Sequence, residues 1–173
     1  AKKPDRRNLA TVRKGEYEGL SQKLQDPNWQ PDFGQAIFNE KSGATAIGAR
    51  EFLIAYNINL NTRDKKLAHD IALDIRENGR YARDKKGKIV RDENGGKVRK
   101  PGLFKEVKAV GWFIEEYHRA QISINFTNYK ITPLHTVVDK VREMALERGL
   151  VVTGCELVGL TPKEAMIIAG RHY

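Results

Sequence analysis

The strongest constraint on the fold of this chain is the alternation of apolar residues along residues 50–60. The even positions are apolar: Phe52, Ile54, Tyr56, Ile58 and Leu60. The odd positions end in three amides: Leu53, Ala55, Asn57, Asn59 and Asn61. A period of two places the even residues on one face of a β-strand and the odd residues on the other. The pattern therefore predicts a strand with one apolar face and one neutral, polar face.

Further patterns follow this strand in an order that predicts the fold. Thr62 is expected to cap a helix that Gly79 stops, and strands are expected over 105–115, 120–131 and 150–160. Thr132 and Pro133 open a second helix, and Thr161 with Glu164 forms a capping box for a last one. The order βαββαβ predicts an α+β, ferredoxin-like domain. We expect a four-stranded, mainly antiparallel sheet with helices on one face and the other face turned toward a ligand or a partner.

The rest of the chain divides around this domain. Residues 1–43 are expected to form an N-terminal arm or linker, with a weak helix over 8–24, and residues 44–173 the ferredoxin-like domain. Residues 79–103 read as a basic insertion loop, because 80–102 hold nine Lys or Arg against three Asp or Glu. That segment accounts for +6 of the net charge of +9, and we interpret it as a solvated insertion, either a projecting hairpin or a loose loop. We expect no internal repeat.

Composition narrows the class of protein. Hydrophobic residues make up 40% of the chain and charged residues 31%, as in ordinary globular proteins. No apolar run approaches the length that spans a bilayer, and no signal-peptide core is present, so we expect a cytoplasmic protein. The single cysteine, Cys155, excludes an internal disulfide and a thiolate zinc site, and we expect no metal.

The polar face of the predicted sheet is the candidate site. The strand over 120–131 places Gln121, Ser123, Asn125 and Thr127 on one side, and these side chains carry no formal charge. Amides and hydroxyls both donate and accept hydrogen bonds, which suits a ligand with mixed polar edges. Asparagine is also unfavourable in strands, which is typical of a functional position. The inferred ligand-facing set is Asn57, Asn59, Asn125 and Thr127.

Established catalytic motifs are missing from the sequence. None of the four histidines has a metal-binding spacing, and there is no phosphate-binding loop, GxSxG elbow or strand-linked GxGxxG. His69 is expected on the solvated side of its helix and His118 in a hairpin turn, while His135 opens a helix and His172 lies near the end. Glu115 and Glu116 alternate faces and make a poor acid–base pair.

Three long runs resemble the glutamate formiminotransferase family, including the formiminotransferase part of formiminotransferase–cyclodeaminase. They are PDFGQAIFNEKSGATAIGAREFLIAYNINL, VKAVGWFIEEYHRAQISINFTNYKITPLH and ELVGLTPKEAM. RRNLATVRKGEYEGL resembles the segment that joins the two halves of that enzyme. The resemblance covers nearly the whole chain except the basic insertion and identifies it with the C-terminal half of the formiminotransferase domain.

The resemblance implies a reaction and its partners. The family transfers the formimino group from N-formimino-L-glutamate to N5 of tetrahydrofolate, its co-substrate, in histidine degradation. In the family, two halves of the domain face each other across a folate-binding tunnel. The implied partners are therefore the N-terminal half, formiminoglutamate and folate polyglutamate. Further copies of the chain are also implied, because a homo-oligomer is expected. The basic charge would assist capture of the polyanionic tail. The implied folate-binding residues are Gly34, Gln35, Ala36, Ile37, Phe38, Asn39, Glu40, Lys41, Ser42 and Gly43.

One family feature is missing. The catalytic histidine of the family lies in a motif resembling HPRMGA in the N-terminal half, and this sequence has no such motif. We therefore expect the chain to supply folate-binding surface and to have little transferase activity alone. The catalytic residues of this chain are unknown, and the donor could also be formiminoglycine or another formimino compound.

Two alternative functions remain open. An RNA-binding module shares the ferredoxin-like fold, but it needs aromatic residues alternating on the open face of the sheet, and the adjacent Trp112 and Phe113 point to opposite faces. A non-catalytic regulatory subunit of the same family would differ by lacking a histidine-bearing partner. No membrane partner is expected, and nucleic acid is disfavoured.

Overall fold

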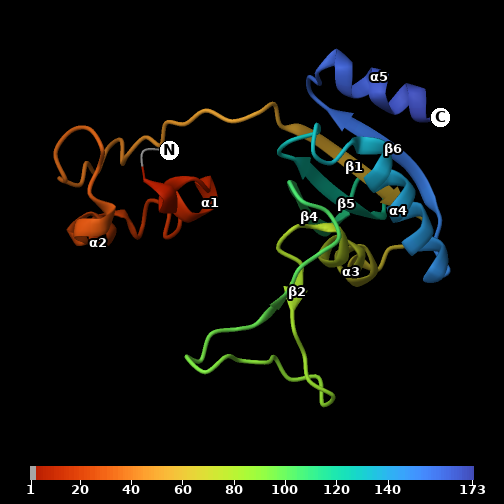
Figure 1. Cartoon of the computed structure of the whole chain (residues 1–173), viewed down its shortest axis with the longest axis horizontal. Coiled ribbons are helices and arrows are strands. Elements are labelled where there is room, and N and C mark those ends of the chain that lie inside the picture. Colours follow the sequence, from red (N-terminus) through yellow and green to blue (C-terminus); the bar gives the residue numbers. More distant parts are fainter. Residues whose placement is uncertain (1–2) are drawn as a thin grey trace. The chain divides into compact units, whose positions relative to one another are not determined.

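The computed structural model describes residues 3–173. The chain divides into two compact units, Ala1–Ala49 and Arg50–Tyr173. Among the described residues, the first unit has short helices and no strand, and the second contains the four-stranded sheet (Figure 1). The elements of the first unit are η1 (Pro4–Arg6), α1 (Leu9–Val12), α2 (Leu20–Gln25) and η2 (Pro27–Trp29).

The predicted helix over 8–24 is interrupted. Helix α1 ends at Val12 and α2 begins at Leu20. Between them Gly15 and Glu16 have φ values of 87° and 47°, which a right-handed helix does not accommodate. Polar contacts replace an apolar core here, since none of the four helices of this unit has a buried residue. Lys23 donates to the carbonyl of Val12 at 2.6 Å and lies 4.1 Å from the Trp29 ring centroid.

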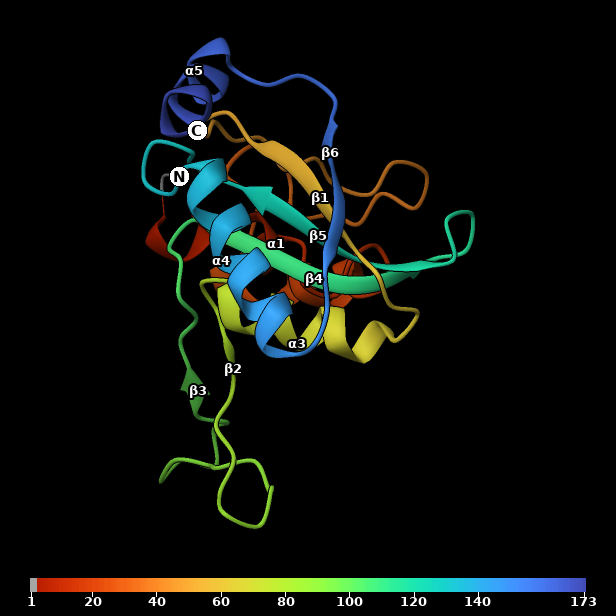
Figure 2. The ribbon, with the colours of Figure 1, turned by 90° about the vertical axis from the view of Figure 1, so that its right-hand side faces the viewer.

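The second unit is an α+β, ferredoxin-like domain, which confirms the predicted fold class. Its four strands lie in the order β4-β5-β1-β6, and every neighbouring pair is antiparallel. Helices α3 and α4 lie across one face of this sheet (Figure 2). The elements are β1 (Ile54–Leu60), α3 (Lys65–Ile75), β2 (Arg80–Tyr81), β3 (Arg99–Lys100), β4 (Val107–Ile114), β5 (Arg119–Phe126), α4 (Leu134–Glu147), β6 (Val152–Val158) and α5 (Lys163–His172).

The alternating pattern correctly identifies the buried face of β1, except at its start. Ile54, Ile58 and Leu60 are fully buried beneath the helices, as predicted. Phe52 is 72% exposed, because the strand begins two residues later and the alternation no longer applies there. The other predicted strands are likewise shorter than expected. Strand β5, for example, ends at Phe126, and Asn128 accepts from the Lys130 backbone N–H in a turn.

The three predicted N-terminal helix caps are wrong, because none of the threonine hydroxyls bonds to the first turn of its helix. Asp64, not Thr62, caps α3 by accepting from the Lys66 N–H at 2.8 Å, and that helix ends at Ile75 rather than Gly79. The Thr132 hydroxyl donates to the carbonyl of Lys105 at 2.7 Å instead of capping α4. A threonine side chain can form a helix cap or a tertiary hydrogen bond, and spacing alone cannot say which.

The predicted capping box of α5 does not form either. The Thr161 hydroxyl is buried and has no partner, and Pro162 occupies the cap position. Glu164 accepts from the Tyr129 hydroxyl at 3.1 Å. This contact ties α5 to the turn after β5, which lies far away in the sequence. The carboxylate therefore stabilises tertiary packing rather than the first turn of its own helix.

Strand β4 and helix α3 approach each other closely at Gly111. A Cβ added to Gly111 would lie 2.1 Å from the backbone nitrogen of His69. The Gly111 N–H also donates to Nδ1 of His69 at 3.4 Å. His69 is half-buried in this contact, so the expectation that it lies on a solvated face is wrong. Glycine is needed here for space rather than for an unusual φ value.

We expect Gly111→Ala to lower the free energy of unfolding by about 3 kcal/mol, the upper end of the usual cost of overpacking, because helix and strand backbones must separate. Urea denaturation followed by circular dichroism would measure it. Gly154→Ala in β6 is the control, since nothing lies within 4 Å of its added Cβ. Equal stability of the two variants would contradict the close approach.

The basic insertion contains an eight-residue repeat that the sequence reading missed. Residues 83–90 (RDKKGKIV) and 91–98 (RDENGGKV) form successive tight turns. In each, the arginine donates to the glycine carbonyl four residues later, at 2.6 Å for Arg83 and 2.7 Å for Arg91. In each, the aspartate Oδ1 accepts from two following N–H groups. The insertion is thus a structured unit and not a loose loop.

Backbone hydrogen bonds close this insertion around a centre with approximate threefold symmetry. The Ala82 N–H donates to Val98, Val90 to Ala82 and Val98 to Val90, at 2.9–3.0 Å. The third arm is the stem, where β2 pairs with β3, and the unit projects away from the sheet (Figure 2). Local hydrogen bonds of this kind explain how a segment with little apolar surface keeps a defined shape.

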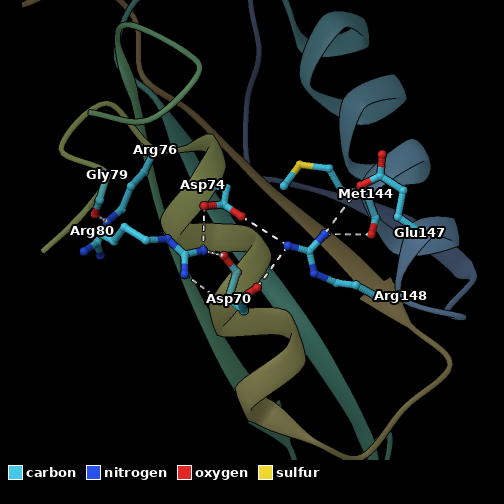
Figure 3. A network of polar contacts seen from close by, with 8 residues as sticks. All are labelled: Asp70, Asp74, Arg76, Gly79, Arg80, Met144, Glu147 and Arg148. Atoms are coloured by element: carbon cyan, nitrogen blue, oxygen red, sulfur yellow. Dashed lines mark hydrogen bonds and ion pairs between the residues drawn. The ribbon is translucent and has the colours of Figure 1, made fainter. Parts of the chain in front are cut away.

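An ion-pair network fixes the base of the insertion to the helices (Figure 3). Asp70 and Asp74 of α3 lie between Arg80 on the insertion side and Arg148 after α4. Their N–O distances run from 2.5 to 3.1 Å. Partial burial raises the pKa of Asp70, but the hydrogen bonds from Arg80 and Arg148 outweigh it, and the net effect is a lowered pKa.

We expect Arg148→Met to cost about 1–3 kcal/mol of unfolding free energy, between the values for exposed and buried pairs. The lowered pKa of Asp70 means that its contribution is present above its unfolded pKa and is lost as pH falls through the folded one. The difference from wild type should therefore shrink on acidification below about pH 4. Lys140→Met breaks an exposed pair with Glu143 and should change stability by less than about 0.5 kcal/mol.

Candidate ligand-binding face

The sheet surface opposite α3 and α4, here called the open face, is built from the outward-pointing residues of all four strands. The pairing register aligns them in rows across the sheet. One row is Trp112, Gln121, Asn59 and Gly154, the next is Val110, Ser123, Asn57 and Glu156, and the third is Lys108, Asn125, Ala55 and Val158. The register thus brings Asn125 of β5 close to Asn57 and Asn59 of β1, which the sequence placed on a different strand.

A chain of side-chain hydrogen bonds crosses the open face at its first row. The Trp112 indole Nε1 donates to Oε1 of Gln121 at 2.8 Å. Nε2 of Gln121 then donates to Oδ1 of Asn59, also at 2.8 Å. Gln121 is 1% exposed, so both ends of its amide are satisfied as burial requires. Trp112 keeps 43% of its surface exposed at the edge of this row.

The second row contains another bond between neighbouring strands. Nδ2 of Asn57 donates to Oε2 of Glu156 at 3.0 Å. Asn57 is 9% exposed, whereas Glu156 is exposed. Glu156 is thus the one carboxylate in these three rows, and it meets the side-chain amide of Asn57. The sequence reading missed both Trp112 and Glu156 as partners, because only the strand register reveals which residues lie opposite.

The other two members of the predicted set differ in their surroundings. Asn125 is exposed, and its side chain has no hydrogen bond to any residue of 3–173. The Thr127 hydroxyl lies beyond the end of β5 and donates to the backbone carbonyl of Glu106 at 3.1 Å, with the Glu106 carboxylate also in contact. Asn125 is therefore free to meet a ligand, whereas Thr127 is already engaged by its neighbour.

The segment 34–43 belongs to the first unit and forms an ordered turn. Oδ1 of Asn39 accepts from the N–H groups of Lys41 and Ser42 at 3.0 and 3.1 Å. The Tyr17 ring packs against Phe38 at 5.4 Å between centroids, and its hydroxyl donates to the carbonyl of Glu40 at 2.5 Å. Most of the side chains of this segment are exposed, including Ile37 at 70%. Its polar groups are consequently accessible.

The histidines lie away from the three rows. His135 and His172 stack with ring centroids 4.2 Å apart, and His172 contacts Asp139 at 2.8 Å. They lie where α4 meets α5, beside a cavity of about 530 Å³ that also reaches Tyr56 and Cys155. Burial lowers the pKa of His135, and His172 lowers it further. Burial also raises the pKa of Tyr56, with the Cys155 thiol adding to the shift.

His118 occupies the predicted hairpin turn, with a φ of 48°. It lines a polar hollow of about 220 Å³ at the end of β1, together with Arg63 and Arg119. Within residues 3–173, no group of three or more histidine, cysteine, aspartate or glutamate side chains is placed to hold a metal ion. What the open face does offer is the hydrogen-bond donors and acceptors of its amides and the exposed edge of Trp112.

Comparison with known proteins matches both units. A model of the formiminotransferase domain matches residues 55–173, and a model of the N-terminal subdomain of that domain matches residues 1–50. The chain is 46% identical to formimidoyltransferase-cyclodeaminase of Gallus gallus over 173 residues, which cover 100% of the chain and 29% of that protein. It is 44% identical to the Dictyostelium discoideum protein of the same name over 168 residues, 97% of the chain and 28% of that protein.

A shorter relative is also similar. Glutamate formimidoyltransferase of Streptococcus pyogenes serotype M1 is 36% identical over 173 residues, 100% of the chain and 50% of that protein. The chain thus spans about half the length of this relative and less than a third of the cyclodeaminase proteins.

Alanine substitutions should separate the two kinds of asparagine. We expect Asn125→Ala to change the free energy of unfolding by less than about 0.5 kcal/mol, because that side chain is exposed and unbonded. Asn57→Ala should cost about 1 kcal/mol, since it removes the bond to Glu156. Thermal denaturation of both variants measures this. A larger loss for Asn125 than for Asn57 would contradict the described contacts.

Proposed function

Since this chain belongs to the formiminotransferase domain family, we propose that it supplies folate-binding surface to a glutamate formiminotransferase. The reaction would transfer the formimino group of N-formimino-L-glutamate to N5 of tetrahydrofolate and release glutamate in histidine degradation. The observation that carries the proposal is the open face, where bonded and unbonded amides lie side by side and a single carboxylate occurs in three rows. Such a face suits a flat, neutral heterocycle better than water or a polyanion.

Binding and orientation are the chemical work proposed for this chain. Attack of N5 on the amidine carbon forms a tetrahedral centre, and its collapse needs a group that moves protons. No histidine occurs at the strand positions of the three rows. The open face would therefore hold the folate while another part of the full-length protein supplies the acid–base group. The lengths of the relatives support this division, because each is at least twice as long as the chain.

We assign residues 34–43 to folate binding as well. The Asn39 turn leaves polar side chains of this segment exposed, and the Tyr17–Phe38 contact holds its backbone in one shape. A fixed backbone turn lowers the entropy lost when a ligand binds. The folate would carry a polyglutamate tail, and the net charge of +9 favours such an anion.

We also propose that the full-length protein works in the cytoplasm, as a homo-oligomer. Within residues 3–173 no helix has the length and apolar character to cross a bilayer.

RNA binding is the rival that the fold allows. The open face offers one aromatic residue in the three rows, Trp112, and its N–H is already bonded to Gln121. Phe126 is fully buried on the helix side. Single-stranded RNA normally needs two or three stacking rings on such a sheet.

Calorimetric titration of 5-formyltetrahydrofolate into the chain tests the proposal, with a short single-stranded RNA as the control. We expect saturable folate binding with a Kd of about 1 mM or tighter, and no RNA binding. RNA binding without folate binding would overturn the proposal. If the chain alone binds neither, the titration is repeated with the full-length protein, and absence of folate binding there would also overturn it.

A further inference from the structure

The hydrogen bonds of the open face fix which way two amides point. An indole N–H can only donate, so Trp112 requires an acceptor, and Oε1 of Gln121 supplies it at 2.8 Å. The other end of the Gln121 amide is then Nε2, a donor, and it requires Oδ1 of Asn59. Because the Trp112 indole can only donate, it fixes the orientation of the Asn59 amide two strands away. Nδ2 of Asn59 takes no part in these hydrogen bonds.

Glu156 has the opposite effect on Asn57. An ionised carboxylate can only accept, so Nδ2 of Asn57 must be the atom that meets Oε2 of Glu156. Oδ1 of Asn57 is therefore the free end of that amide. The two asparagines lie two residues apart on β1, about 6.6 Å along the strand, on the same face.

Both free amide ends remain accessible. Neither Nδ2 of Asn59 nor Oδ1 of Asn57 has a hydrogen-bond partner among residues 3–173. Neither atom is among the buried, unpartnered side-chain atoms of those residues, although both side chains are largely covered. Each atom thus keeps contact with solvent and can meet a ligand. The pair offers an N–H at one position and a C=O at the next.

We infer that Trp112, Gln121 and Glu156 are positioning residues that preset Asn59 as a donor and Asn57 as an acceptor, and so select a ring with an acceptor and a donor on one edge. This inference rests on the proposed function. The reduced pterin of the folate fits it, because its 2-amino-4-oxo edge carries both a carbonyl and N–H groups. Presetting the amides removes the cost of ordering them when the ligand binds.

Gln121→Glu reverses one half of this arrangement while nearly keeping the shape of the side chain. The carboxylate still accepts from Trp112, but it has no N–H for Oδ1 of Asn59. The Asn59 amide must turn over to donate to it, and Oδ1 then faces the ligand. We expect affinity for 5-formyltetrahydrofolate, measured by calorimetry on the same protein that binds it, to fall about ten- to a hundredfold.

Arg119→Gln is the matched control for charge. Arg119 lies two residues from Gln121 on the same strand, and it takes no part in the hydrogen bonds that join Trp112, Gln121 and Asn59. Its substitution lowers the net charge by the same amount as Gln121→Glu. Its affinity should stay within about threefold of wild type. Trp112→Phe frees Gln121 to adopt either orientation and should give an intermediate loss, about three- to tenfold.

The fragment p-aminobenzoylglutamate, which lacks the pterin, separates this inference from general damage to the face. Gln121→Glu should leave its affinity unchanged. An equal loss for the fragment and the folate, or no loss for the folate, would overturn the inference. Failure of the unaltered chain and of the full-length protein to bind folate would instead overturn the proposed function.

Nuclear magnetic resonance tests the chain of bonds without any ligand. The protein has two tryptophans, so Trp29→Phe assigns the Trp112 indole N–H. That N–H should exchange slowly with solvent in the wild type and in Gln121→Glu, which also shows that the variant is folded. The Gln121 side-chain N–H₂ signals should exchange slowly too. Fast exchange of both groups in the wild type would show that the hydrogen bonds from Trp112 to Gln121 and from Gln121 to Asn59 do not form.

Discussion

Packing of α3 and α4 on one face of the sheet is the interaction on which the rest of residues 50–173 depends. The buried apolar set draws on every strand of the sheet except β6 and on both helices, with Ile58 and Ile122 fully buried among them. Apolar burial is the main favourable term in folding, and here it is concentrated on a single side. The close approach at Gly111 belongs to the same layer, since any side chain there would push α3 away. The residues on the opposite side of each strand therefore contribute little apolar burial to the stability of the domain.

That division explains how the open face can carry residues that are poor in strands. Asparagine and glutamine weaken a sheet unless their amides find partners when they are covered. Gln121 has partners at both ends of its amide, and Asn57 has one in Glu156. The hydrogen bonds offset the cost of burial, and they also settle the direction of each amide. In the proposed function, stability and ligand selection would therefore depend on the same few contacts, which lie outside the apolar core.

The basic insertion is stabilised in a different way from the sheet and its helices. Its shape comes from two copies of one local turn and from three backbone bonds around Ala82, Val90 and Val98. The core contributes only the anchor, through Asp70 and Asp74 of α3 (Figure 3). Most of its cations are exposed and take no part in that anchor, although Arg83 and Arg91 each hold one of the two turns.

The sequence by itself determined the order of the elements, the buried face of β1 and the amide-rich opposite face of the two central strands. These follow from local periodicity, because each residue in a strand points opposite to its neighbour whatever lies around it. It also contained the runs that identify the family. It did not determine the caps, since Thr132 and Thr161 had tertiary surroundings that their spacing does not encode. Nor did it reveal that Phe52 lies outside the strand.

Only the tertiary structure decided which polar residues meet. Trp112, Gln121 and Asn59 come from three strands, and a shift of one residue in either pairing would turn one of them to the helix side. Register depends on the whole sheet and its packing, so local sequence cannot fix it. The sequence therefore determined the kind of side chains on this surface, and the fold determined the direction of each hydrogen bond between them. A hydrogen bond needs its two atoms within about 3 Å, and these residues are far apart along the chain.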